Sequence, residues 1–182
     1  NRIKDDDSSV PYYDNGYFYY TRFEKGKQYP IYCRKKNLKS KEEVLIDVNI
    51  FSKGFEYYRV GSIDISPDNK IMAYSYDTLS RRLYTIKFIN LETRKGIGKS
   101  ITNTSGGVSW ANDNKTVFYD KKNIETLRNE KVFKYNLYDG QNQQVFFEED
   151  ETFNLNSYKT KSGKYIIISS SKTISDEYWV LN

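Results

Sequence analysis

The chain has 182 residues, of which 37% are hydrophobic and 16% aromatic, with 18 tyrosines but only three prolines. Its 29 lysines and arginines are interleaved with 24 acids and give a formal net charge of +5. This composition excludes a disordered linker, and no apolar run approaches the ~20 residues that a membrane-spanning helix needs. We therefore expect a folded chain with no membrane partner.

One short phrase occurs four times along the chain, a tight-turn pair followed by a run of apolar and aromatic residues. The copies begin at Asn15-Gly16, Asp68-Asn69, Asp113-Asn114 and Ser162-Gly163. The steps from Asn15 to Asn69, Asn114 and Gly163 are 54, 45 and 49 residues. A period of about 40 to 50 residues with several strands in each unit is typical of β-propeller blades. We predict an all-β fold, a partial β-propeller of about three and a half four-stranded antiparallel blades.

Residues 1–14 are charged and turn-rich, and we expect an approach segment there, ahead of blades at roughly 15–50, 57–102, 106–149 and 152–182. The alternating apolar pattern predicts strands at 16–22, 29–35, 44–48, 58–66, 71–77, 83–90, 97–101, 107–110, 116–121, 131–137, 144–148, 153–160, 164–169 and 177–181. Residues 122–130 look less like strand than their counterparts, and no stretch sustains the 3.6-residue period of a helix.

The chain offers no recognisable catalytic chemistry. It has no histidine, the commonest general base and metal ligand, and its single cysteine cannot build a zinc site. It also lacks a Gly-x-Ser-x-Gly elbow, a glycine-rich phosphate loop and a dinucleotide fingerprint. We therefore predict no catalytic, cofactor-binding or metal-ligating residue, and no cofactor.

An acidic run, Glu148-Glu149-Asp150-Glu151, is the strongest charge feature. It is either a solvated blade rim or a surface that attracts a cationic ligand. A second feature is Asp77 with Arg81 and Arg82, which flank a loop between two strands and favour a structural ion pair.

Three further side chains have structural interpretations. Cys33 lies in an alternating strand as a small core residue, and Trp110 is expected to anchor packing between blades. The run Arg34-Lys35-Lys36 is read as a solvated turn at a strand exit. Nucleic-acid binding needs a basic face with interleaved aromatics, and the aromatics here belong to strand patterns, so we expect no nucleic-acid partner. One cysteine favours a cytoplasmic location, with the periplasm left open.

The order of the phrases resembles the propeller of the prolyl oligopeptidase family, and its oligopeptidase B (protease II) branch in particular. The resemblance is carried by eight segments along the chain. They are 9–11 with 16–17, 29–32, Ile65-Ser66-Pro67-Asp68-Asn69-Lys70-Ile71-Met72-Ala73, Leu79-Ser80-Arg81-Arg82-Leu83-Tyr84, 88–93, Ser109-Trp110-Ala111-Asn112-Asp113, 148–153 and 159–162. These phrases span almost the whole chain, and a generic propeller would share the turns without this order.

The resemblance implies a serine peptidase in which a seven-bladed propeller caps an α/β-hydrolase domain with a Ser-Asp-His triad. Similar enzymes cut short peptides after Arg or Lys, and their propeller keeps folded proteins away from the triad. The catalytic domain and the remaining blades would then be the partners of this chain, with peptides as substrates of the parent. By resemblance, Asp77, Arg81 and Arg82 would lie near the interdomain face.

The expected function is a non-catalytic propeller portion that gates the access of short peptides. The alternative is a freestanding propeller module that binds a protein or a glycan. About three and a half blades leave strand edges and apolar faces unpaired, so we also expect the isolated chain to self-associate.

Overall fold

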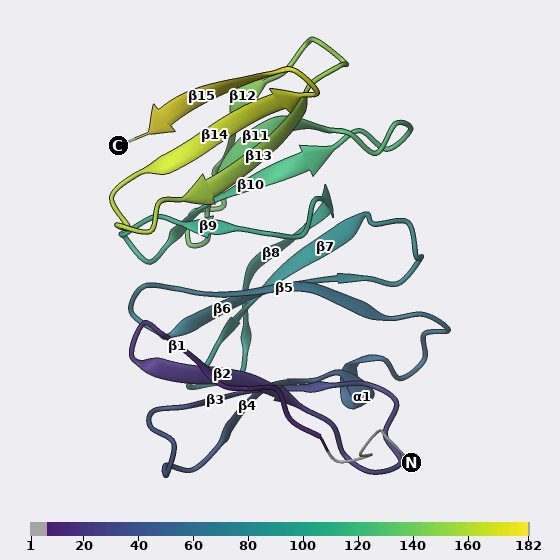
Figure 1. Cartoon of the computed structure of the whole chain (residues 1–182), viewed down its shortest axis with the longest axis vertical. Coiled ribbons are helices and arrows are strands. Elements are labelled where there is room, and N and C mark those ends of the chain that lie inside the picture. Colours follow the sequence, from purple (N-terminus) through teal and green to yellow (C-terminus); the bar gives the residue numbers. More distant parts are fainter. Residues whose placement is uncertain (1–6, 182) are drawn as a thin grey trace. The chain divides into compact units, whose positions relative to one another are not determined.

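The computed structural model describes residues 7–181 and consists of antiparallel sheets with one helical turn (Figure 1). The chain divides into two compact units, Asn1–Tyr58 and Arg59–Asn182. The predicted all-β, partial-propeller fold is confirmed, and every expected strand overlaps an observed one. The expected domain boundaries stay a prediction, and residues 1–6 of the expected approach segment lie outside the described residues.

The first unit is one four-stranded antiparallel sheet, which we call blade 1. Its strands in order are β1 (Tyr12–Asp14), β2 (Tyr17–Arg22), β3 (Ile31–Lys35) and β4 (Glu43–Asp47). A single helical turn, α1 (Val48–Phe51), follows, and the Asp47 side chain caps it by accepting a hydrogen bond from the Asn49 N–H at 2.9 Å.

Strand β1 lies within residues 1–14, the segment expected to approach the blades. It pairs with β2 through a hairpin in which Asn15 and Gly16 have φ values of 41° and 86°. Tyr12 stacks on Tyr19 with ring centroids 5.6 Å apart. Such cross-strand aromatic pairs stabilise a sheet, so a strand forms despite the charged surroundings.

Two further residues of blade 1 have definite environments. Cys33 is 1% exposed and is confirmed as a small core residue, and burial raises the pKa of its thiol to about 12. Arg34 is 3% exposed, donates to Glu43 Oε2 at 2.7 Å and lies 4.1 Å over the Tyr17 ring. The interpretation of Arg34-Lys35-Lys36 as a solvated turn is therefore wrong at Arg34, which lies inside strand β3.

The second unit contains three antiparallel groups of strands, called blades 2, 3 and 4. Blade 2 has β5 (Arg59–Ile65), β6 (Ile71–Asp77), β7 (Tyr84–Asn90) and β8 (Gly96–Thr104). Blade 3 has β9 (Ser109–Trp110), β10 (Thr116–Lys122), β11 (Asn129–Asn136) and β12 (Asn142–Phe147). Blade 4 has β13 (Asn154–Lys159), β14 (Ile166–Lys172) and β15 (Ser175–Leu181). The pairing of Lys121 with Thr104 joins blades 2 and 3 into one continuous sheet.

Two kinds of turn recur in this unit. The first is the predicted tight turn, in which Asn69, Asn114 and Gly163 adopt φ values of 64°, 61° and 71°. In the second, an asparagine side chain accepts the N–H two residues later, and the backbone closes on a residue with positive φ. Its copies are Asn90 to Arg94, Asn123 to Leu127 and Asn136 to Gly140. The Asn123 copy explains why residues 122–130 looked less like strand.

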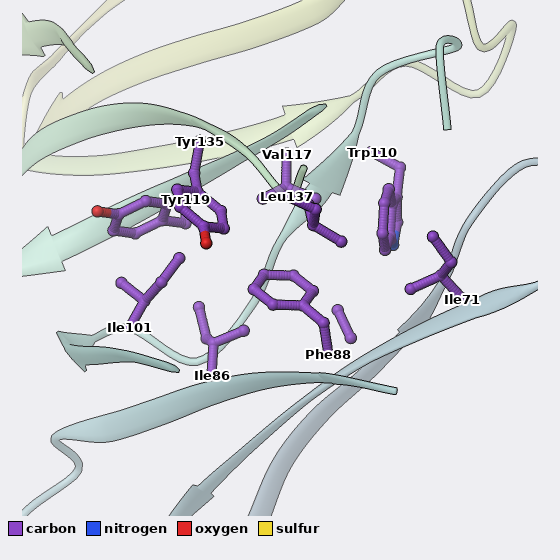
Figure 2. Close-up of a cluster of buried hydrophobic side chains, with 10 residues drawn as sticks. Ile71, Ile86, Phe88, Ile101, Trp110, Val117, Tyr119, Tyr135 and Leu137 are labelled. Atoms are coloured by element: carbon purple, nitrogen blue, oxygen red, sulfur yellow. The ribbon is translucent and has the colours of Figure 1, made fainter. Parts of the chain in front are cut away.

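A shared apolar core joins blades 2 and 3 (Figure 2). Trp110 is 5% exposed, meets Phe88 edge-on with centroids 6.2 Å apart, and donates from Nε1 to the Asp64 carbonyl at 3.1 Å. The expectation that Trp110 anchors packing between blades is confirmed. A smaller core of Val132, Leu155 and Ile168 joins blades 3 and 4.

Gly98 lets blade 3 approach the outer strand of blade 2. It has a φ of 63°, and a Cβ there would lie 2.9 Å from Tyr135 Oη and 3.1 Å from the Leu137 carbonyl oxygen. The Tyr135 hydroxyl also accepts a hydrogen bond from the Lys99 N–H at 2.9 Å. Only glycine combines this backbone angle with this close contact.

Gly98→Ala should therefore lower the free energy of unfolding by about 2 kcal/mol, through strain at positive φ and crowding of Tyr135. Urea denaturation of the chain measures the loss. The matched control is Gly96→Ala on the same strand, where a Cβ meets only the Phe88 carbonyl at 3.8 Å. Equal losses in the two variants would contradict the close packing at Gly98.

Asn114 combines a turn conformation with a hydrogen bond between blades, because its Oδ1 accepts from the Asp68 N–H at 2.8 Å. Asn114→Gly should keep the turn but lose this bond, at a cost of about 1 kcal/mol. Asn114→Asp keeps an acceptor and tolerates the same backbone angle, so it should cost less. Urea denaturation of both variants decides, and a larger loss for Asn114→Asp would count against the assigned bond.

Candidate functional site

The loop between β6 and β7 is organised by Asp77, which is 2% exposed. Its Oδ1 accepts the Leu79 N–H and its Oδ2 accepts the Arg82 N–H, both at 2.8 Å. Ser80 and Arg82 both have a φ of 57°. The buried carboxylate therefore holds a tight loop in place through two main-chain hydrogen bonds, and the loop presents its other side chains outward.

The expected ion pair in this loop is not formed. In the part of the chain that the structure describes, no ion pair joins Asp77 to Arg81 or Arg82, and both arginines are exposed. Burial, together with the nearby charge of Arg82, lowers the pKa of Lys122. The sequence pattern grouped Asp77 with Arg82 correctly. However, Asp77 binds backbone N–H groups, which a sequence pattern cannot identify.

Two other hairpins emerge at the same end of the second unit. Antiparallel strands reverse direction at each turn, so the loops at 78–83, 123–128 and 173–174, each between the second and third strands of a blade, share one end (Figure 1, right side). Each carries an exposed aliphatic side chain, Leu79 at 72%, Ile124 at 57% and Ile174 at 90%. We call Leu79, Arg81, Arg82, Ile124 and Ile174 the hairpin face.

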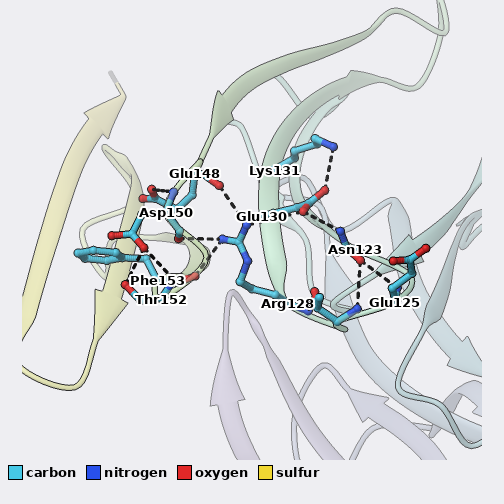
Figure 3. A network of polar contacts seen from close by, with 10 residues as sticks. Asn123, Glu125, Arg128, Glu130, Lys131, Glu148, Asp150, Thr152 and Phe153 are labelled. Atoms are coloured by element: carbon cyan, nitrogen blue, oxygen red, sulfur yellow. Dashed lines mark hydrogen bonds and ion pairs between the residues drawn. The ribbon is translucent and has the colours of Figure 1, made fainter.

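The acidic run folds around an arginine of its own chain (Figure 3). The Arg128 guanidinium donates to the carbonyls of Glu148 at 3.2 Å, Asp150 at 3.3 Å and Phe153 at 3.0 Å. It also lies 3.7 Å from Glu130 Oε2. Arg128 was missed in the sequence because it precedes the run by 20 residues and no local pattern connects them.

Two of the four acids have structural partners. Glu148 Oε1 accepts the Asp150 N–H at 3.0 Å, and its Oε2 accepts the Ser170 hydroxyl. Asp150 accepts both the N–H and the hydroxyl of Thr152, and the backbone bond is the main reason that its pKa is lowered. Glu149 and Glu151 are exposed. The run is therefore an ordered turn at the blade rim, and attraction of a cationic ligand stays a prediction for its exposed acids.

Residues 7–181 contain no group of three or more Cys, Asp or Glu side chains placed to hold a metal ion together. No helix in this range has the length and apolar character to cross a membrane. The hairpin face and the acidic turn are two exposed surfaces of the second unit.

The chain matches the family model for the prolyl oligopeptidase N-terminal β-propeller domain over residues 1–182. It is 38% identical to dipeptidyl aminopeptidase BI of Pseudoxanthomonas mexicana, over 97% of this chain and 27% of that protein. It is 31% identical to protease 2 of Moraxella lacunata, over 99% and 28%.

Among solved structures, the fold is similar to oligopeptidase B from Leishmania major, with a TM-score of 0.93 and 31% identity over 99% of this chain and 26% of that one. Oligopeptidase B from Trypanosoma brucei, with covalently bound antipain, gives a TM-score of 0.89 at 27% identity, over 99% and 26%. The chain thus spans about a quarter of the length of these relatives. It belongs to the prolyl oligopeptidase family, as part of the N-terminal β-propeller domain.

Proposed function

We propose that this chain is the part of a serine oligopeptidase that limits which peptides reach a catalytic domain outside these residues. The observation that carries the proposal is the match to the family's propeller domain over residues 1–182. Relatives named as peptidases continue for about three times the matched length. A propeller joined to a hydrolase can admit short peptides while larger folded chains stay outside.

The hairpin face is the surface we propose to meet the catalytic domain. Its three aliphatic tips and two arginines are exposed in the second unit. The opposite end carries the tight turns of Asp68, Asp113 and Ser162, which are polar. Exposed apolar side chains beside cationic ones suit a protein surface that is apolar and acidic. Asp77 supports this role by holding the loop that carries Leu79, Arg81 and Arg82.

Catalysis itself would come from the other domain. A nucleophilic serine needs an adjacent base, and the chain has no histidine. Cleavage after Arg or Lys is the specificity we propose for the parent. The exposed Glu149 and Glu151 would then raise the local concentration of cationic peptides, an effect that salt would screen.

The gating role can be tested in the full-length protein with Leu79→Asp and Ile124→Asp. Charges at the hairpin face should weaken domain docking and raise cleavage of a folded protein substrate, relative to a short Arg-containing peptide, by about tenfold. The control is Tyr138→Asp, which alters a 68% exposed side chain in a turn at the opposite end. If Leu79→Asp and Ile124→Asp both keep the wild-type ratio of the two rates, as the control should, the hairpin face is not the gate.

The separation of roles gives a second test. The isolated chain should not hydrolyse Arg- or Lys-containing peptides, whereas the full-length protein should. Turnover that stays with the isolated chain through successive purification steps would overturn the assignment. A full-length protein without a Gly-x-Ser-x-Gly motif followed by Asp and His would instead favour the alternative, a propeller module that binds a protein or a glycan.

A further inference from the structure

Side chains of blade 3 hold the free edge of β13. Among residues 7–181 this strand pairs only with β14, so its other edge carries backbone groups that none of the described strands satisfies. The Ser157 N–H donates to Asp120 Oδ2 at 3.1 Å, and Asn129 Nδ2 donates to the Leu155 carbonyl at 2.9 Å. Ser109 Oγ approaches the Ser157 carbonyl at 3.4 Å. Polar side chains thus take the place of a neighbouring strand.

Asp120 and Asn129 converge on one short stretch of this edge. Residues 155 and 157 are two apart in a strand, so their backbone groups point to the same side, at most about 7 Å from each other. In the β10–β11 pairing, Asp120 lies opposite Val132 and Asn129 lies opposite Lys122. The carboxylate and the amide are therefore neighbours at the contact between blades 3 and 4.

Each of these two side chains has one oxygen without a hydrogen-bond partner. Asp120 Oδ1 and Asn129 Oδ1 are buried and accept no hydrogen bond from any residue that the structure describes. Asp120 is 4% exposed. The amide nitrogen of Asn129 is already committed to Leu155, so both remaining atoms are acceptors. Buried oxygens of this kind are normally satisfied, so Asp120 Oδ1 and Asn129 Oδ1 call for a bound cation or a hydrogen-bond donor.

Nearby cationic side chains do not supply that charge. Lys121 lies 5.7 Å over the Phe133 ring, and Lys131 and Arg128 pair with Glu130. Lys122 forms no ion pair within residues 7–181, and burial lowers its pKa. Asp120 is 4% exposed, and no cationic side chain of residues 7–181 forms an ion pair with it. A buried negative charge without a counter-ion is strongly destabilising.

We propose that Asp120 Oδ1 and Asn129 Oδ1 bind a sodium or potassium ion at the contact between blades 3 and 4. Carboxylate and amide oxygens are ligands that hard cations prefer, and one positive charge balances the single carboxylate. The ion locks the free edge of β13 to blade 3. This inference concerns the blade contact and does not depend on the gating function.

A cation, a water molecule and a proton at this site would each give the blade contact a different dependence on salt and pH. A bound cation makes the contact depend on the identity of the salt. A water molecule would satisfy both acceptors but leave the charge, and would give no dependence on salt identity. A proton alone would give a dependence on pH without any dependence on salt.

The test is hydrogen–deuterium exchange, read by mass spectrometry on peptides covering β13, in the full-length protein at about pH 8. Sodium chloride and potassium chloride are compared with tetramethylammonium chloride at equal ionic strength, because the methyl groups of that cation keep oxygen ligands away from its charge. Exchange of the Ser157 region should be about fivefold slower with sodium or potassium, because ion binding stabilises the closed contact. Equal exchange in the three salts would overturn the proposal.

Asp120→Asn removes the charge but keeps an oxygen for Ser157, so it should abolish the salt difference. The matched control is Asp64→Asn, because Asp64 is the other carboxyl whose pKa burial raises to about 6, and it contacts Ser62 and Val108 instead. This control should keep the difference at β13. Asn129→Ser shortens the second ligand and should reduce the salt difference in exchange at β13. This variant replaces Asp120→Asn in the test if Asp120→Asn fails to fold. A salt difference that survives both Asp120→Asn and Asn129→Ser places the ion elsewhere and contradicts the site.

Discussion

The second unit depends on the contact of Trp110 with blade 2. A blade is a sheet with two faces, and it cannot bury either face without a neighbour. Trp110 fills the space beside Phe88 and satisfies the Asp64 carbonyl, so one side chain supplies both apolar burial and a hydrogen bond across the contact. The same packing of blade 3 on blade 2 brings Gly98 close to Tyr135. It also stacks Phe88 on Tyr135 with ring centroids 5.8 Å apart.

Polar side chains then determine how each blade is aligned with the next. Asn114 reaches the Asp68 N–H, Asn112 donates to the Gly163 carbonyl at 2.9 Å, and Asp120 accepts from Ser157. An apolar core alone tolerates sliding, whereas directional bonds to backbone groups do not. Buried carboxylates at such contacts carry a cost in desolvation. That cost makes Asp120 the place where an ion would have the largest effect on the contact.

The hairpin face and the acidic run lie outside these contacts between blades. The hairpin face combines exposed aliphatic side chains with two arginines, and Asp77 keeps the most basic of its loops rigid. The acidic run is equally ordered, because Arg128 binds its carbonyls from within. Loops that are held rigid in this way can present charge to another polypeptide without a large loss of conformational entropy.

The sequence by itself determined the repeat, the antiparallel strands and the tight turns. These follow from local rules, because the alternation of side chains and the positive φ of Asn69 and Asn114 depend on neighbouring residues alone. Tertiary structure decided the rest. The burial of Arg34, the loop-binding role of Asp77 and the position of Arg128 each depend on partners that are distant in sequence or belong to the backbone. Backbone groups carry no residue identity, so a sequence pattern cannot reveal which side chain they will bind.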